Sequence, residues 1–455
     1  MDRERHQQVI TVGILSAPEV EFELLADAEV CGSPVGKGRY RASARDGKIE
    51  FEGSLFDRLR FSFPAPKGDD APFSPPCFTL NDVVIGVDFH WQRREKQTFP
   101  GDLLLLCTEG GITAVNVVGV EDYLRSVISS EMKSSASPEF LKAHSVISRS
   151  WLLAQIERRE HGMRPASAPH ADSASQVVEA AGISADSASV DGLASAPAAS
   201  GFTAGETIIK WFDREDHTLF DVCADDHCQR YQGLSRMIQE KVDEVISQTW
   251  GEVLIYEGAL CDARFSKCCG GMMERFDTCW ENRDLPYLQP LPDAEGHSAD
   301  NPPFCSLADA KILSRVLNDY DLETDDFYRW SVTYSRKELS ELVCRRSGID
   351  FGEITALVPI ERGPSGRISL LQIVGTRRKM AVGKELLIRK WLSETHLKSS
   401  AFDVEVSDDG FTLSGRGWGH GVGLCQIGAA VMGEKGYNYR DILSHYFPGS
   451  HIETV

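Results

Sequence analysis

Glycine occupies every second position of one stretch near the C-terminal end, Gly415 to Gly423, which reads GRGWGHGVG. Successive side chains of a strand point to opposite faces, so this pattern leaves one face of a strand bare. The other face would carry Arg416, Trp418, His420 and Val422. Glycine weakens a strand through entropy and lost packing, so five in register predict that a ligand or another chain segment approaches the backbone closely.

Two interpretations of this stretch are open. A tryptophan between an arginine and a histidine can serve as a platform for a sugar, whereas a tight crossing of strands accounts for the glycines alone. A dinucleotide loop is disfavoured, because the G-x-G-x-x-G spacing does not occur here. Residues 425–435 and 439–447 then read as short helices, ended by Gly436 and by Pro448-Gly449. Gln426 would lie at the junction of strand and helix, a common place for a ligand-facing polar side chain.

Composition excludes several classes of partner. The chain has 455 residues, enough for two or three domains, and 48 basic against 68 acidic residues give a net charge of −20. With no block of Lys and Arg, neither nucleic acid nor an anionic membrane surface is an expected partner. The chain contains no run of 18 apolar residues, so the sequence predicts no transmembrane segment. The N-terminal residues lack the apolar core of a secretory signal, which predicts either a cytoplasmic protein or one whose export segment is missing from this sequence.

The pattern of the chain predicts a mixed α+β fold in four parts. Residues 1–115 alternate short apolar runs with Gly, Pro and Asp, as a β-rich region does. Residues 116–161 read as two helices, residues 162–205 as an Ala/Ser-rich mobile insertion, and residues 206–455 as a second mixed region. In that last part we expect loops over 265–280 and 284–293, helices over 331–348 and 384–397, and strands over 356–363 and 368–375.

A helical stripe singles out Glu131. Val120, Tyr123, Leu124, Val127 and Ile128 follow the three-and-four spacing of one helix face, and the next member of that face is Glu131. Desolvation of a carboxyl group favours its neutral form, which suits a proton donor near neutral pH. The alternative is a glutamate that turns out to solvent where the helix frays.

A second helix follows, with Ser137 as its N-cap and Pro138 at its first position. Its apolar face includes Phe140, Ile147 and Trp151. His144 lies beside that face and Arg149 lies opposite it, and a lone histidine in such a place is more often a hydrogen-bonded core residue than a catalyst.

Four residues form a compact metal-binding pattern, His217-x5-Cys223-x3-His227-Cys228. Thiolate and imidazole are the ligands that zinc prefers. Neighbours 227 and 228 can bind one ion only if the backbone turns there; otherwise the fourth ligand is elsewhere, with Cys268 or Cys269 as candidates. Four protein ligands close the site, so we expect a structural zinc ion. The alternative is a chance grouping of residues in a chain with 12 cysteines.

Several segments together resemble the stage II sporulation protein D family, which is related to the amidase-enhancer proteins. They are VEDYLRSVISSEM (120–132), AHSVISRSWLLA (143–154), QRYQG (229–233), CCGG (268–271), GRGWGHGVGLCQIGA (415–429) and YRDILSHYFPG (439–449). The resemblance covers roughly residues 115–455, apart from the insertion. It implies that 116–161 and 206–455 form one catalytic region with a substrate cleft.

The resemblance implies a lytic transglycosylase that cleaves peptidoglycan glycan strands, in sporulation relatives after the stem peptides are removed. The family's catalytic glutamate falls on Glu131, which would act as general acid and then general base to give a 1,6-anhydro product. The candidates for holding substrate are Arg149, Tyr231, Arg416, Trp418, His420 and Gln426. Similar proteins include zinc binders whose cluster falls on residues 217–228. The family also implies the cell envelope or periplasm as location, and a cell-wall amidase as a further partner.

Three departures from the family pattern concern this region. The chain has His144 where relatives often have Gln, Ser266-Lys267 where they have a His-Ser pair, and Cys425 where they have Ser. Three functions are therefore open: a lytic transglycosylase, a non-catalytic glycan-binding enhancer of an amidase, and a zinc-dependent hydrolase.

Overall fold

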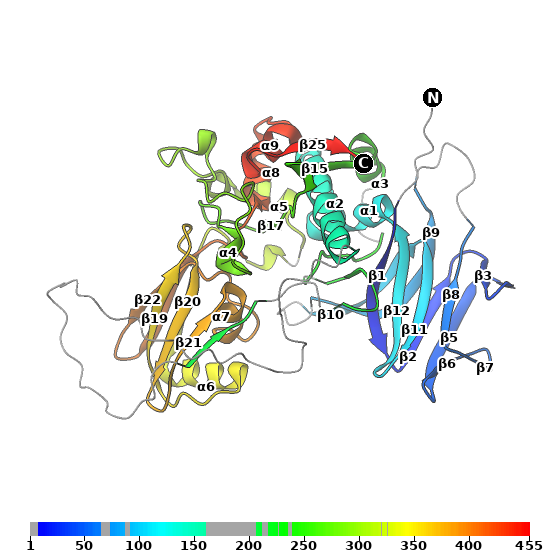
Figure 1. Cartoon of the computed structure of the whole chain (residues 1–455), viewed down its shortest axis with the longest axis horizontal. Helices are drawn as coiled ribbons and strands as arrows, with labels where there is room; N and C mark the ends of the chain where they lie inside the picture. Colours follow the sequence, from blue (N-terminus) through cyan, green and yellow to red (C-terminus); the bar gives the residue numbers. More distant parts are fainter. Residues whose placement is uncertain are drawn as a thin grey trace.

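The structure of the chain, a computed structural model, describes residues 8–64, 73–86, 92–160, 206–211, 217–225, 227–234, 239–319, 321–324 and 326–455. The insertion predicted for residues 162–205 lies outside the described residues. The mixed α+β prediction is confirmed, because the described residues form both helices and sheets. Figure 1 shows a β-rich N-terminal part, a central group of helices and a second group of sheets. Within these residues no helix combines the length and apolarity needed to cross a membrane.

Two sheets make up the N-terminal part. One has the order β14-β1-β12-β11-β8 and the other the order β10-β9-β2-β5-β6-β7. The first contains β1 (Val9–Ala17), β8 (Arg58–Phe61), β11 (Asp102–Thr108), β12 (Gly111–Gly119) and β14 (Val222–Cys223). The second contains β2 (Glu19–Leu24), β5 (Gly38–Arg45), β6 (Lys48–Phe51), β7 (Ser54–Phe56), β9 (Pro76–Ile85) and β10 (Arg93–Pro100). A hairpin of β3 (Ala28–Val30) and β4 (Ser33–Val35) is separate.

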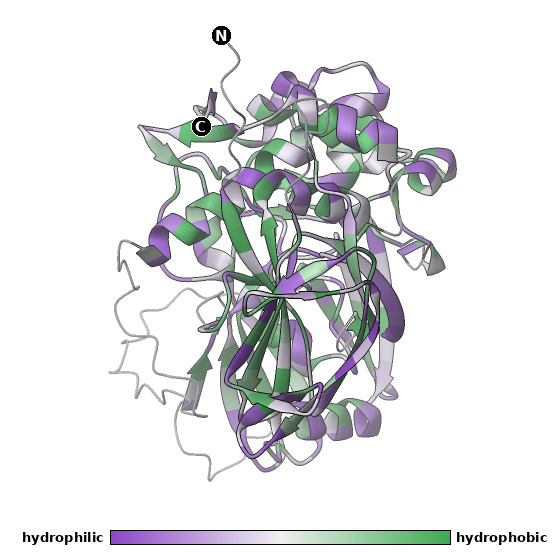
Figure 2. Ribbon diagram, turned by 90° about the vertical axis from the view of Figure 1, so that its right-hand side faces the viewer, coloured by the Kyte–Doolittle hydropathy of each residue, from purple (hydrophilic) through white to green (hydrophobic). Residues whose placement is uncertain are grey.

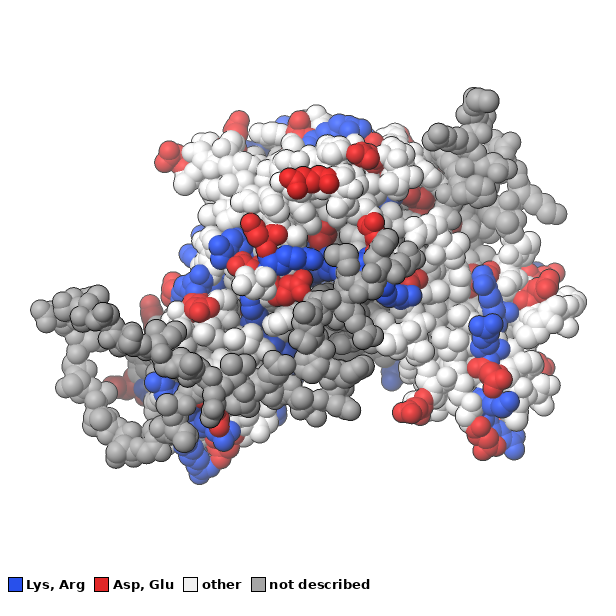
Figure 3. Space-filling model, in the orientation of Figure 1, with Lys and Arg blue, Asp and Glu red and all other residues white. Residues whose placement is uncertain are grey.

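Alternation of apolar and polar residues explains these strands. In β2, Val20, Phe22 and Leu24 are buried while Glu19 and Glu21 are exposed, as a strand with one face on a core requires. Figure 2 shows hydrophobic and hydrophilic residues alternating along the strands of this part. The outer face is charged, and Figure 3 shows basic and acidic side chains next to one another along it rather than in a patch of one sign.

Two helices lead from this part to the centre of the molecule. α1 (Val120–Glu131) begins at the residue after β12 ends, so the strand fixes where the helix points. α2 is Pro138–Glu160, and the Phe140 N–H donates to the Ser137 hydroxyl at 3.3 Å, which confirms the predicted N-cap. α2 packs against α1 and against α3 (Gln239–Gln248), α8 (Gln426–Glu434) and α9 (Tyr439–Tyr446). The last two confirm the helices predicted after the glycine repeat.

The second group of sheets has the orders β13-β21-β20-β19 and β18-β23-β22. Its strands are β13 (Glu206–Ile209), β18 (Arg329–Ser335), β19 (Ile354–Arg362), β20 (Ile368–Gly375), β21 (Lys379–Gly383), β22 (Phe402–Val406) and β23 (Gly410–Arg416). Its helices are α6 (Arg336–Ser347) and α7 (Glu385–Trp391). The strands expected at 356–363 and 368–375 are confirmed. The helix expected from 331 was wrong at its start, because residues 331–335 pair with β23 and Ser335 caps the helix.

Short elements connect these groups. They are β15 (Glu252–Tyr256), β16 (Ala259–Leu260), β17 (Phe265–Ser266), α4 (Phe276–Cys279), η2 (Glu295–His297), η3 (Phe304–Leu307), α5 (Ala310–Val316), η4 (Asp321–Glu323), β24 (Leu424–Cys425) and β25 (His451–Thr454). β17 pairs in parallel with β24, and β25 pairs with β15. The loop-rich character predicted for 265–280 and 284–293 is confirmed.

The glycine repeat does not continue as a strand, and that prediction was wrong. β23 ends at Arg416, and glycines 417, 419, 421 and 423 have φ angles of 74°, 90°, 73° and 71°. This left-handed backbone is open to glycine and strained for other residues. We call residues 417–423 the glycine ribbon. The predicted close approach is confirmed, since a side chain at Gly417 would meet the Cys268 carbonyl oxygen and one at Gly423 the Arg264 carbonyl oxygen.

Replacing Gly423 by alanine should lower the free energy of unfolding by at least about 2 kcal/mol, because the left-handed backbone and the overlap with the Arg264 carbonyl both oppose a methyl group. Gly436→Ala is the matched control: it has a φ of 90° but no atom within 4 Å of the added carbon, so about 1 kcal/mol is expected. Urea unfolding of both variants measures the difference, and equal losses would show that the contact with Arg264 is unimportant.

Candidate functional site

Glu131 lies at the C-terminal end of α1 and is buried, with 8% of its surface exposed. Its Oε1 accepts a hydrogen bond from the backbone N–H of Arg230 at 3.0 Å. The next residues of that loop are held to the same helix turn, because the Gln232 N–H donates to the Ser130 hydroxyl at 3.1 Å. The side chain therefore does not turn out to solvent at a frayed helix end, which was the alternative interpretation.

A buried ion cluster surrounds the end of α1. The Lys267 ammonium donates to Asp321 Oδ2 at 2.9 Å and to the Glu131 carbonyl oxygen at 3.3 Å, and the Arg230 guanidinium lies 3.6 Å from the same Asp321 oxygen. All four residues are less than one tenth exposed. Burial raises the pKa of Asp321, but Lys267 and Arg230 outweigh it and hold the pKa of that carboxyl below its usual range. Asp321 thus compensates the two cations beside Glu131.

Lys267 also connects Glu131 to the glycine ribbon. The next residue, Cys268, exchanges two backbone hydrogen bonds with Trp418, at 3.1 and 2.8 Å. The Lys267 carbonyl oxygen accepts from the Ile427 N–H at 3.1 Å, in the first turn of α8. Lys267 therefore contacts the backbone of Glu131 through its side chain and α8 through its own carbonyl oxygen, and its neighbour Cys268 pairs with Trp418.

His144 and Gln426 meet in the same region. Gln426 Nε2 lies 3.0 Å from His144 Nε2, and His144 Nδ1 lies 3.2 Å from the Ser148 hydroxyl. A neutral ring satisfies both contacts by accepting from the amide and donating to the hydroxyl. Burial, with Lys267 nearby, lowers the pKa of His144 to about 3. This fits a hydrogen-bonded core histidine that fixes Gln426.

Trp418 is partly exposed beside a pocket. Its ring lies 5.0 Å from that of Phe327, and the Lys398 ammonium lies 5.5 Å from its centre. A pocket of about 240 Å³ is lined by Trp418, Lys398 and His396 among others. Glu131 is not among its lining residues, so a continuous substrate cleft remains a prediction.

Arg416 and His420 flank the tryptophan but face other groups. Arg416 is exposed, and its guanidinium donates to the Ser365 carbonyl oxygen at 3.2 Å. The His420 ring packs on Trp280 with centroids 4.8 Å apart. Burial, together with nearby arginines, holds the pKa of His420 well below its usual range.

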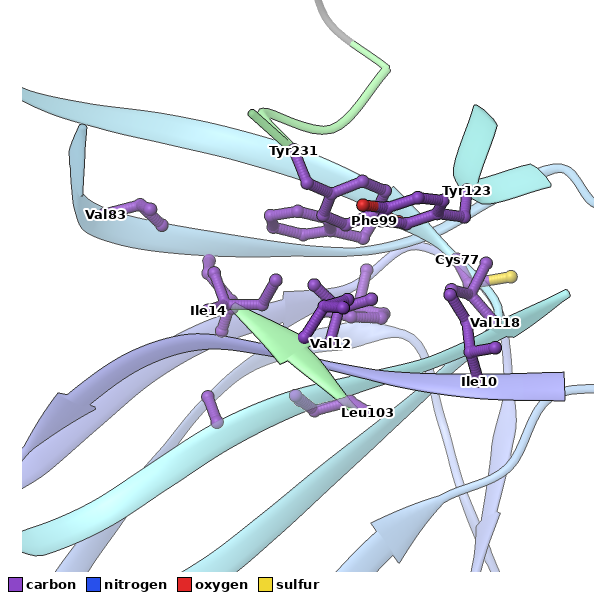
Figure 4. Close-up of a cluster of buried hydrophobic side chains, with 14 of the residues drawn as sticks. Ile10, Val12, Ile14, Cys77, Val83, Phe99, Leu103, Val118, Tyr123 and Tyr231 are labelled. Atoms are coloured by element: carbon purple, nitrogen blue, oxygen red, sulfur yellow. The ribbon is translucent and has the colours of Figure 1, made fainter. Parts of the chain in front are cut away.

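The side chains of Arg149 and Tyr231 face buried partners, although Tyr231 lies between Arg230 and Gln232, whose N–H groups bind the end of α1. Arg149 is 1% exposed and makes two hydrogen bonds to the carboxylate of Glu121, at 2.8 and 2.6 Å. Tyr231 is fully buried in the core drawn in Figure 4, where it stacks on Tyr123 at 5.0 Å and donates to Asn116 Oδ1 at 2.6 Å. Both side chains are committed to structural contacts, so their predicted role in binding substrate gains no support from their positions.

The metal-binding pattern comes together in space. The ligand atoms of His217, Cys223, His227 and Cys228 all lie within 4.8 Å of one another. The backbone turns as required, because the Cys228 N–H donates to the Asp225 carbonyl oxygen at 3.0 Å. Hydrogen bonds from Cys228, and then from the two histidines, outweigh burial and lower the pKa of Cys223 to about 2. Neither Cys268 nor Cys269 belongs to this group, so the zinc ion stays a prediction with four ligands from one segment.

Sequence reasoning missed three residues of the site: Arg230, Lys267 and Asp321. Arg230 follows the metal-binding segment, and Lys267 stood out only as a departure from the family pattern. Asp321 lies in a short 3₁₀ turn, 54 positions after Lys267, and no local pattern indicates the pairing.

Replacing Lys267 by methionine should destabilise the protein by about 3 kcal/mol, because it removes one cation from a buried carboxylate. Lys133→Met is the matched control: its partner Asp319 is largely exposed, and a loss below about 1 kcal/mol is expected. Chemical unfolding of the full chain gives both values, and a loss for Lys267→Met no larger than that of the control would contradict a buried ion cluster.

The His144→Gln variant should reduce the dependence of stability on pH. A histidine with a pKa of about 3 when folded and about 6.5 when unfolded contributes stability above pH 6.5 that is lost as pH falls towards 3. Between pH 7 and pH 5 the parent should therefore lose about 2 kcal/mol more than His144→Gln. The exposed His451→Gln is the control in the same urea titrations, and parallel curves for parent and His144→Gln would refute a ring kept neutral by burial.

Two known protein domains match parts of this chain. Residues 108–256 match the family described as Stage II sporulation protein, and residues 274–423 match a domain of unknown function, DUF8618. The chain is 23% identical over 235 residues to an amidase enhancer of Bacillus subtilis, covering 47% of this chain and 32% of the relative. It is 27% identical over 218 residues to stage II sporulation protein D of Bacillus amyloliquefaciens, covering 48% and 52%.

A longer match exists to a protein described only as uncharacterized. It comes from Brachyspira hyodysenteriae and is 22% identical over 379 residues, covering 82% of this chain and 74% of the relative. The matches to the amidase enhancer and the sporulation protein span a third to a half of those relatives. Residues 108–256 therefore match the stage II sporulation protein family, in agreement with the family resemblance of the motifs in that range.

Proposed function

We propose that this chain acts on the bacterial cell wall as a lytic transglycosylase, with Glu131 as its catalytic residue. The observation that carries the proposal is the position of this glutamate: a buried carboxyl group at a helix end, held by the Arg230 N–H and linked through Lys267 to Trp418 and α8. A family domain over residues 108–256, which contains Glu131, supports it.

The chemistry requires one carboxyl group. Glu131 as general acid protonates the glycosidic oxygen between N-acetylmuramate and N-acetylglucosamine while an oxocarbenium-like centre develops. The resulting carboxylate then takes the proton of the muramate 6-hydroxyl, whose oxygen closes the 1,6-anhydro ring. No water is consumed, so no second catalytic carboxylate is needed.

Other residues position the reaction. Trp418, with its partly exposed ring beside a pocket, is suited to stacking against a sugar. The Gln426 amide lies within hydrogen-bond distance of His144 Nε2, and it is a candidate for positioning the sugar or the loop that binds the sugar. The Asp321 carboxylate offsets the positive charges of Lys267 and Arg230 next to the end of α1.

The His217–Cys228 cluster is suited to a structural zinc ion. Two thiols and two imidazoles are a donor set that closes a tetrahedral site, and such an ion supplies folding energy rather than catalysis. Cys228 is two residues from Arg230, whose N–H binds Glu131, so an ion here would fix the loop that holds the catalytic carboxyl. A closed site of this kind argues against the zinc-dependent hydrolase.

A second candidate is a non-catalytic enhancer that binds glycan and stimulates a cell-wall amidase. The similarity to a protein named amidase enhancer favours it. This function would use Trp418 and the glycine ribbon but not Glu131. Both candidates place the protein at the cell envelope, where its substrate lies.

The test uses purified glycan strands stripped of their peptides. Mass spectrometry should detect 1,6-anhydro ends after incubation with the parent chain, and Glu131→Gln should reduce their formation at least 100-fold, because a single general acid commonly contributes that much. The control is Glu240→Gln, an exposed carboxylate on α3, which should retain full activity.

The outcomes separate the candidates. If the parent binds the strands and stimulates an amidase without producing anhydro ends, and Glu131→Gln does the same, the enhancer function replaces the proposed one. Reducing ends in place of anhydro ends would show that water is consumed and would contradict the transglycosylase mechanism.

A further inference from the structure

A second group of metal-ligating side chains lies in the core, separate from the His217–Cys228 cluster. It consists of Cys269, Asp293, Cys305 and Cys425, all of them buried, and their ligand atoms lie within 4.8 Å of one another. They come from four segments: the loop after β17, the loop before η2, the helical turn η3, and the N-cap of α8. The topology therefore brings three thiols and one carboxylate to a single point.

The spacing of these atoms suits a tetrahedral ion. The Sγ atoms of Cys269 and Cys305 are 3.6 Å apart, and Cys269 Sγ is 3.3 Å from Asp293 Oδ2. A zinc ion with Zn–S bonds of about 2.3 Å and Zn–O bonds of about 2.0 Å separates its ligands by about 3.8 Å (S to S) and about 3.5 Å (S to O). A disulfide would instead require about 2.05 Å between the sulfurs.

Polar groups around the cluster support its ligands. The N–H groups of Cys269 and Gly428 point to Cys425 Sγ at 3.2 and 3.4 Å, and the Gly271 N–H points to Cys269 Sγ at 3.4 Å. These contacts favour thiolates, and Gly428 lies in the first turn of α8, where the helix dipole adds to the effect. Such outer hydrogen bonds are typical of metal sites.

Asp293 argues against a purely apolar cluster of cysteines. Its carboxylate is 0% exposed, and the Tyr446 hydroxyl donates to Oδ1 at 2.7 Å while the Cys305 N–H donates to Oδ2 at 3.3 Å. Among the described residues, the basic side chain within ion-pair distance is that of His445, at 3.6 Å. A buried carboxylate is costly unless a cation compensates it, whereas thiols alone pack well as small apolar groups.

We propose that Cys269, Asp293, Cys305 and Cys425 bind a structural zinc ion. Thiolate and carboxylate ligands in a compact buried set match zinc, and the set leaves no open position for water. The ion would join residues 269–305, which contain only short elements, to the N-terminus of α8, and so would stabilise the loops that pack beneath the glycine ribbon.

Metal analysis of the purified full chain tests the proposal. Cys305→Ser should contain one equivalent of zinc less than the parent, while Cys261→Ser, a buried thiol outside both groups, should retain the parent's content. Cys228→Ser should disable the His217–Cys228 cluster and still hold one equivalent. Equal zinc in the parent and in Cys305→Ser would overturn the proposal, as would a zinc-free Cys228→Ser chain.

A second measurement applies if Cys305→Ser does not fold. Cobalt(II) added to metal-free Cys228→Ser should give the intense near-ultraviolet absorption of cobalt bound by thiolates, and zinc should displace it. No thiolate absorption would overturn the proposal. So would peptide mapping without reductant that finds Cys269 and Cys305 joined in the parent chain, because that disulfide would then occupy the site.

Discussion

The burial of the Lys267 ammonium determines how the central elements of this protein meet. A lysine with 8% exposure must be neutralised where it lies, and Asp321 and the carbonyl end of α1 provide the negative partners. A helix C-terminus favours a cation, so the contact suits both groups. Because the carbonyl of the same residue accepts from α8 and the chain leads into Cys268, this side chain is one of the contacts that link the end of α1 to the glycine ribbon.

Local patterns predicted much of this arrangement. The three-and-four spacing that ends at Glu131, the Ser137 cap and the two helices after the glycine repeat each depend on residues close in sequence, and the structure contains them. The glycine period of two was misleading, because alternation in sequence does not distinguish a flat strand from a backbone with positive φ at every second residue. The start of α6 was misplaced because Val332, Thr333 and Tyr334 favour a strand, and they pair with β23 ahead of the helix.

Contacts between distant segments could not be predicted in this way. The four residues from His217 to Cys228 were recognisable because they lie in one short segment, whereas Cys269, Asp293, Cys305 and Cys425 come from segments up to 156 positions apart. The pairing of Lys267 with Asp321 has the same character. Arg149 and Tyr231 each belong to a family motif, and the structure adds that each contacts a buried partner, Glu121 and Asn116 respectively, which the motifs did not indicate.

The pairing of strand β14 determines which residues a stable fragment of this protein must contain. Val222 and Cys223 pair in parallel with Val12 and Gly13 of β1, which lies between β14 and β12. A fragment excised at residue 108, where the family match starts, would lose β1 and leave both neighbours without their shared partner. The thiol at Cys223 would lose its support from the sheet. The boundary seen by sequence comparison is therefore not a boundary of independent folding, and the N-terminal strands are part of the scaffold of the proposed enzyme.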